Sequence, residues 1–271
     1  MKKIRRAMFS GYFYPANTIK LSDEIETLLS ISKPEIALQH LTGIITPHAG
    51  YIYSGRTAAF AYNLLRGKLI EKVIIISPSH REYFPGICIY DGDGYETPFG
   101  IVEVDKQLAD NIAKEHRIIY KGIEGHKEEH AIEVQIPFLQ KVLSGFKIVP
   151  MVMGDQGKLF IDELAIRIHE AADEKTLIVA SSDLSHYYSK PEADQLDSII
   201  EDDINEFDYE KLRHDLDNKS CEACGGGPIV AMMKAAYLMN KRNAKVLNRS
   251  NSGDTTGDYS GVVGYLSAAV Y

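Results

Sequence analysis

The sequence predicts an α/β fold: a single domain over residues 1–271, with three α/β/α layers around a mostly parallel or mixed central sheet. Two observations lead to this prediction. Several short apolar runs rich in β-branched residues show no polar alternation, which is typical of strands buried on both faces of a parallel sheet. Segments with helical spacing alternate with these runs, and no linker, repeat or low-complexity segment interrupts the pattern.

The individual elements follow from these patterns. We expect buried strands at 43–46, 73–77, 146–153 and 177–181, a β-rich stretch at 86–104 with a turn at 91–94, and closing strands at 245–250 and 261–269. We expect helices at 21–30, 56–65, 106–115, 131–143, 160–170, 191–207 and 229–239. Ser22 is the expected N-cap of the first helix. Pro137 predicts a kink or an early break in the helix that contains it.

The composition limits the possible partners. The chain has 271 residues, is 45% hydrophobic and 25% charged, and carries a net charge of −8, which disfavours a nucleic-acid partner. Its apolar runs are shorter than the roughly 18 residues of a membrane span, so we expect no membrane partner and a cytoplasmic location. The basic cluster Lys2, Lys3, Arg5 and Arg6 is expected to be a solvated tail.

Three histidines follow buried strands. His48 comes after the strand at 43–46, His80 after 73–77, and His186 after 177–181. Ligand sites of open α/β sheets lie just beyond the carboxyl ends of their strands. Imidazole is both a common metal ligand and a general acid or base near neutral pH. The three histidines therefore predict a metal or acid–base site.

Asp183 lies three residues before His186, and its side chain has two possible roles. The carboxylate either orients an imidazole or caps the following turn. A Ser–His–Asp triad is disfavoured, because the sequence has no Gly-x-Ser-x-Gly motif.

The three cysteines, Cys88, Cys221 and Cys224, are too few and odd in number for a disulfide framework. Cys221 and Cys224 form a Cys-x-x-Cys pair, but the sequence context required for a redox motif or a structural zinc site is missing. Cys224 precedes three glycines at the start of a predicted helix, where exposed amides would lower the pKa of its thiol. A thiolate there would ligate a metal or attack an electrophile; alternatively, both cysteines are buried apolar residues.

His126 and His130 are spaced to share one face of a helix. The segment nearly matches His-Glu-x-x-His, but Lys127 stands where a zinc protease needs its glutamate, so we do not expect that activity. His130, together with Glu133, remains a candidate for the pocket. The remaining histidines are expected to be surface or helix residues: His40, His116, His169 and His214.

Taken together, these segments resemble the Memo family, whose prokaryotic branch is called AmmeMemoRadiSam system protein B. The resemblance runs in consistent order from Phe9 to the C-terminus. It rests on Pro-His-Ala-Gly-Tyr-Ile-Tyr-Ser-Gly at 47–55, Ser-Pro-Ser-His at 77–80, Thr-Pro-Phe-Gly at 97–100, Glu-His-Ala-Ile-Glu-Val-Gln-Ile-Pro-Phe-Leu-Gln at 129–140, Ser-Ser-Asp-Leu-Ser-His at 181–186 and Cys-Gly-Gly-Gly-Pro at 224–228.

The Memo family is similar in fold to class III extradiol dioxygenases, which are non-haem iron enzymes. The resemblance implies that His48, His80 and Cys224 ligate a divalent metal, with Fe(II), Cu and Zn not distinguished. It also implies that His186 is the neighbouring acid–base residue, with His130 as a further wall residue. The dioxygenases use a carboxylate as third ligand. A thiolate is softer, favours zinc or copper while remaining compatible with iron, and can itself be oxidised.

Three functions stay open at this point. The first is a metal-dependent, dioxygenase-like oxidoreductase for a small aromatic or otherwise oxidisable molecule. The second is a non-catalytic binding or adaptor protein for peptides, a role that the resemblance implies, with Tyr51, Tyr53 and Arg56 as candidate recognition residues. The third pairs the protein with a radical-enzyme partner, as the family name implies. The fold analogy supports a site more strongly than it supports ring cleavage, and the sequence leaves the oligomeric state open.

Overall fold

The computed structural model describes residues 2–114 and 116–271. Its main sheet is mixed and runs in the order β10–β12–β2–β9–β3–β8–β4–β7, with β11 also paired to β12. The parallel centre consists of β2 (Gly43–Thr46), β9 (Thr176–Ser181), β3 (Lys72–Pro78) and β8 (Lys147–Met153). The flanking strands are β10 (His186–Tyr188), β11 (Ala244–Asn251), β12 (Val262–Val270), β4 (Ile87–Tyr90) and β7 (Ile119–Gly122).

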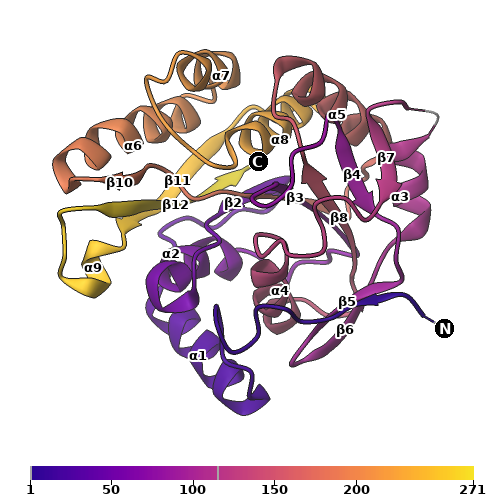
Figure 1. The fold of residues 1–271 in the computed structure, drawn as a ribbon, viewed down its shortest axis with the longest axis horizontal. Coiled ribbons are helices and arrows are strands. Elements are labelled where there is room, and N and C mark those ends of the chain that lie inside the picture. The colour runs from indigo at the N-terminus through magenta and orange to yellow at the C-terminus, as the bar shows by residue number, and fades with distance from the viewer. Residues whose placement is uncertain (1, 115) are drawn as a thin grey trace.

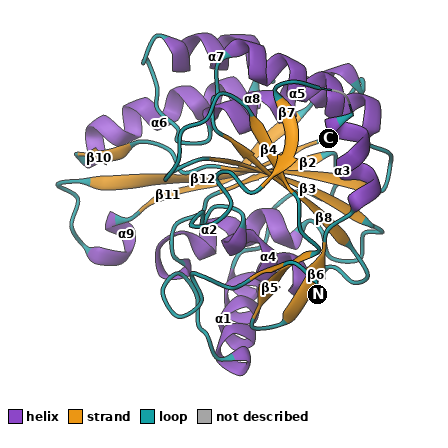
Figure 2. Ribbon diagram, turned by 45° about the vertical axis from the view of Figure 1, so that its right-hand side comes forward, coloured by secondary structure: helices purple, strands orange, loops and turns teal. Residues whose placement is uncertain are grey.

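Helices cover both faces of this sheet (Figures 1 and 2). One face carries α3 (Lys106–Ala113), α5 (Lys158–Ala171), α6 (Lys190–Asn205), α7 (Tyr209–Asp217) and α8 (Gly226–Leu238). The other carries α1 (Thr18–Ile31), α2 (Tyr51–Asn63) and α4 (Ile136–Val142), the last preceded by the 3₁₀ turn η1 (Glu133–Gln135). A short helix, α9 (Gly253–Thr256), connects β11 to β12. The predicted three-layer α/β/α architecture is confirmed.

The central strands are buried on both faces, as their composition predicts. Ile44 and Ile75 belong to the core beneath α1, α2 and α4, whereas Ile45, Ile74 and Ile76 belong to the core on the opposite side. Because side chains alternate along a strand, a strand covered on both faces needs apolar residues at every position. The apolar positions 44–45 and 73–76 at the centres of β2 and β3 meet this requirement.

Several predicted boundaries are wrong for identifiable reasons. The first helix begins at Thr18, because the Asn17 side chain accepts hydrogen bonds from the amides of Ile19 and Lys20; Ser22 is therefore not its N-cap. Pro137 lies in the first turn of α4, where its missing N–H costs nothing, so it follows a helix start and makes no kink.

The boundaries of two further helices also differ from the prediction. Helix α2 begins at Tyr51, five residues before its predicted start, and α3 ends at Ala113; the predicted last residue, 115, lies outside the described residues. The sequence patterns gave no signal for α7 or β7.

A small second sheet places the N-terminus. It has the order β1 (Ile4–Arg5), β5 (Gly94–Thr97) and β6 (Gly100–Glu103), with β1 parallel to β5. Arg5 was expected to be solvated but is buried, which corrects the prediction of a free basic tail. Its guanidinium pairs with Glu133 and donates to the carbonyl oxygens of His126 at 2.7 Å and Glu129 at 2.6 Å.

Glu133 anchors this N-terminal segment and does not join the candidate site, contrary to the prediction. Besides Arg5, its carboxylate accepts the amide N–H groups of Met8 at 3.0 Å and Phe9 at 2.8 Å, and the hydroxyl of Tyr14 at 2.6 Å. A fully buried carboxylate needs such compensation, since desolvation of an unpaired charge is costly. The four interactions fix residues 5–14 against the domain.

Within residues 2–114 and 116–271, none of the helices combines the length and the apolar character needed to cross a lipid bilayer.

Replacing Arg5 by Met should lower the free energy of unfolding by about 3–5 kcal/mol, because the buried Glu133 carboxylate would lose its counter-ion. The matched control is Arg6→Met. The Arg6 side chain is 75% exposed and pairs with Glu96, and such a pair contributes less than about 1 kcal/mol. Urea denaturation of both variants measures the difference. Equal losses would contradict the assigned role of Arg5.

Candidate metal centre

The candidate site forms where three neighbouring parallel strands end. His48 follows β2 by two residues, His80 follows β3 by two, and Asp183 follows β9 by two. The strand order β2–β9–β3 makes these ends adjacent, and Thr46 lies level with Ser181 across the first pair. The parallel register therefore brings together residues that are 32 to 135 positions apart in sequence.

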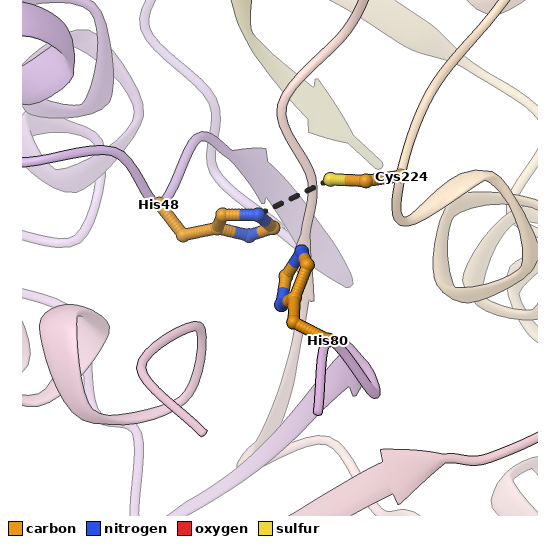
Figure 3. A group of neighbouring side chains, drawn as sticks. All are labelled: His48, His80 and Cys224. Atoms are coloured by element: carbon orange, nitrogen blue, oxygen red, sulfur yellow. Dashed lines mark hydrogen bonds between the residues drawn. The ribbon is translucent and has the colours of Figure 1, made fainter. Parts of the chain in front are cut away.

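His48, His80 and Cys224 form a compact group, which we call the ligand cluster (Figure 3). One ligand atom from each of the three lies within 4.8 Å of the others. His48 Nε2 is 3.2 Å from Cys224 Sγ, and the imidazole rings of His48 and His80 meet edge to face with centroids 5.0 Å apart. Two imidazole nitrogens and a sulfur at this spacing are a donor set that fits zinc, copper or iron.

His80 is oriented by a buried carboxylate. Glu129 accepts the His80 backbone N–H at 2.8 Å and the ring Nδ1–H at 2.9 Å, while the amide of Ala131 donates to the same carboxylate at 2.8 Å. With Nδ1 engaged in this way, Nε2 is the nitrogen left for the ligand cluster. Histidines that donate a ring N–H to a carboxylate are common in metal sites, because the carboxylate fixes the tautomer of the ring and increases the basicity of the ligating nitrogen.

Glu129 is ionised in this environment. Burial alone would raise its pKa, but the hydrogen bond from His80 and the charges of His80 and His130 lower it to about 2. Glu129 also forms a second group of metal-ligand type with His80 and His130. Three hydrogen bonds already occupy its carboxylate, so the geometry favours an orienting role. Sequence reasoning missed Glu129, because 49 residues separate it from His80.

Cys224 is held by the loop after β9 and by a glutamine. Its backbone N–H donates to the Asp183 carbonyl at 3.2 Å, and the Asp183 N–H points at Cys224 Sγ at 3.3 Å. Gln156 donates to the Cys224 carbonyl at 2.8 Å and accepts the amide of Gly227, in the first turn of α8, at 2.7 Å. Sequence reasoning did not single out Gln156, because nothing near it in the chain marks a site.

The thiol of Cys224 differs from the expectation. We expected the start of α8 to lower its pKa, but burial and the nearby Asp183 carboxylate raise it. The thiol is therefore protonated in the metal-free protein, and a bound metal would have to displace its proton. Cys221 is buried in the apolar core, and all three cysteines are free.

His130 lies against the ligand cluster, as predicted for a wall residue. Its ring centroid is 4.7 Å from that of His80 and 5.2 Å from that of His48, and the rings of Phe9 and Phe13 also pack against it, with centroids 5.6 and 4.7 Å away. Burial, followed by the charge of His48, lowers the pKa of His130 to about 3. The anchored N-terminal segment thus supplies an aromatic wall beside the site.

Asp183 and His186 have different partners from those expected. Asp183 accepts the His48 backbone N–H at 2.8 Å, and its second oxygen is 3.9 Å from His48 Nε2, so it orients the loop of His48 and not His186. Burial raises the pKa of Asp183. His186 is partly exposed on β10, with Nδ1 3.7 Å from Glu222 Oε1. Its acid–base role stays a prediction.

Two other expectations concern residues that prove structural. His126 and His130 do not share a helix face, because the chain at 124–128 forms turns. His126 donates from Nε2 to the Cys88 carbonyl at 2.9 Å and accepts the Tyr95 hydroxyl at 2.7 Å. Tyr51, a candidate recognition residue, is buried, and its hydroxyl donates to the carbonyl of Val134.

These features define an α/β protein with a candidate histidine–cysteine metal centre at the carboxyl ends of its parallel strands. Residues 5–269 match the family described as "Memo-like protein". The chain belongs to that family, as its sequence motifs predict.

Relatives of similar length support this membership. A MEMO1 family protein of Thermoplasma volcanium is 38% identical over 267 residues, covering 97% of each chain. A MEMO1 family protein of Methanocaldococcus jannaschii is 37% identical over 287 residues, covering all of both chains. Among solved structures, an uncharacterized protein from Escherichia coli K12 matches with a TM-score of 0.62 at 12% identity, covering 86% of this chain and 100% of that one. At that identity, the match shows the shared α/β fold alone.

The environment of His126 predicts a pH dependence of stability. Burial is the main cause that lowers its pKa from 6.5 to about 4, so the folded state holds the neutral ring. The contribution is fully present above pH 6.5 and is lost as the pH falls toward 4, because the unfolded chain binds the proton first. The shift corresponds to about 3 kcal/mol over that interval.

Denaturation of wild type and His126→Gln at pH 7 and pH 5 tests this prediction. The variant should lose less stability between the two pH values than wild type, since the glutamine does not titrate. An identical loss in both proteins would show that His126 is not the group responsible.

Proposed function

We propose that this protein binds one transition-metal ion through His48, His80 and Cys224 and acts as a non-haem, metal-dependent oxidoreductase on a small oxidisable molecule. The observation that carries the proposal is the ligand cluster itself, in which Ser181 and Glu129 engage Nδ1 of the two histidines and leave both Nε2 atoms for a metal. The family's similarity in fold to class III extradiol dioxygenases supports the oxidoreductase class, and the cysteine ligand leaves the metal as Fe(II), Cu or Zn.

The residues around the ligand cluster suit this chemistry. A bound metal of this kind would supply Lewis-acid and, for iron or copper, redox chemistry. His130 with Phe9 and Phe13 would exclude water on one side of a substrate. His186, on the partly exposed side near Glu222, would accept or donate a proton at the substrate. The three free cysteines agree with a reducing compartment, and we propose a cytoplasmic location.

Metal content tests the proposal directly. The protein is purified anaerobically and loaded with Fe(II), Cu or Zn. We expect about one ion per chain in wild type. The metal content of His80→Ala and of Cys224→Ser should be lower by about tenfold or more, because a site of three ligands depends on each ligand. The matched controls are His40→Ala, which removes an exposed histidine, and Cys221→Ser, which alters the neighbouring cysteine. Near-zero metal in wild type, or equal metal in all variants, would refute the site.

Glu129→Gln should lower metal affinity by about 10–100-fold without removing a ligand, because the carboxylate that orients His80 is lost. Its control is Glu128→Gln, which neutralises the exposed neighbouring carboxylate. Competition titration against a chelator measures both affinities. If the two variants bind metal equally well, Glu129 does not orient the ligand.

A further inference from the structure

Hydrogen-bond donors and acceptors around Ser181 determine where its proton lies. The Ser181 hydroxyl is fully buried at the end of β9 and has three neighbours: the Ala131 carbonyl at 2.8 Å, Gln135 Nε2 at 2.8 Å and His48 Nδ1 at 2.9 Å. A carbonyl oxygen only accepts and an amide nitrogen only donates. The single hydroxyl proton of Ser181 therefore goes to Ala131, and one lone pair receives Gln135. The remaining lone pair faces His48, so Nδ1 must carry a proton.

Gln135 has no freedom to reverse this arrangement. Its side-chain oxygen accepts the hydroxyls of Tyr62 at 2.6 Å and Thr46 at 2.9 Å, and its nitrogen donates to Ser181 and to the Pro47 carbonyl at 3.0 Å. An amide flip would set the NH₂ group against two hydroxyls and the oxygen against a carbonyl. All four positions of the buried amide are thus satisfied in one orientation.

We propose that Ser181, held in place by Gln135, is a positioning residue that keeps His48 in the tautomer with the proton on Nδ1 and a free lone pair on Nε2. That lone pair points toward Cys224, 3.2 Å away. His48 and His80 are thus prepared in the same tautomer by different partners, a neutral hydroxyl for one and a carboxylate for the other. The inference rests on the proposed metal site for its effect on affinity, but the tautomer itself belongs to the metal-free protein.

The tautomer can be observed by long-range ¹H–¹⁵N correlation spectroscopy of the ¹⁵N-histidine-labelled, metal-free full chain, with His48→Gln to assign the signals. Wild type should show the pattern of a neutral ring protonated at Nδ1. In Ser181→Ala this proton loses its acceptor, and we expect a mixture of tautomers or the Nε2–H form. Metal affinity, measured with the same ion in both proteins, should fall by about 10–100-fold.

The matched control is Ser77→Ala. Ser77 is also buried near the end of a central strand, β3, but within the described residues its hydroxyl has no hydrogen-bond partner. This control should change neither the tautomer nor the affinity. A wild-type His48 protonated at Nε2 would overturn the inference without any variant. So would a Ser181→Ala protein whose His48 signals and affinity match those of Ser77→Ala. Failure of the metal site itself would appear separately, as unchanged metal content in Cys224→Ser.

Discussion

The register of the parallel strands β2, β9 and β3 is the constraint on which the site depends. Thr46 pairs with Ser181, and Ile76 pairs with Ala180, so the three strands end at nearly the same level of the sheet. Two residues beyond the end of each strand lies a residue of the candidate site: His48 after β2, Asp183 after β9 and His80 after β3. A shift by one residue would reverse the faces of every strand residue and would bury the wrong side chains in both cores. The packing of the sheet and the geometry of the site are therefore fixed by the same pairing.

Around the ligand cluster, polar groups from distant parts of the chain are satisfied by one another. Glu129 is hydrogen-bonded to His80, and Ser181 to His48. Gln156 is hydrogen-bonded to the carbonyl of Cys224. Buried polar groups without partners cost free energy, and fully connected networks favour a single arrangement. This connectivity holds the two imidazoles and the thiol of the ligand cluster close together in the metal-free protein. The site is thus a preorganised part of the fold.

Much of this arrangement could be predicted from the sequence. The buried strands have consecutive apolar residues at their centres, and the histidines that follow them lie beyond the strand ends, so the fold class and the ligand candidates follow from local patterns. The partners of those histidines do not. Glu129, Gln135 and Ser181 act through contacts across 46 to 133 residues, which no periodicity reports. Local patterns also failed for Arg5, because its burial depends on Glu133, 128 positions away.

The place of β12 has a consequence for synthesis of the chain. This last strand pairs with β2, β10 and β11. Until residues 262–270 leave the ribosome, β2, the strand before His48, has an open edge, and β10 and β11 lack their partner strand. An exposed edge strand invites pairing with another chain. A premature stop just before β12 would keep every residue of the ligand cluster, yet it would leave a truncated protein prone to aggregation.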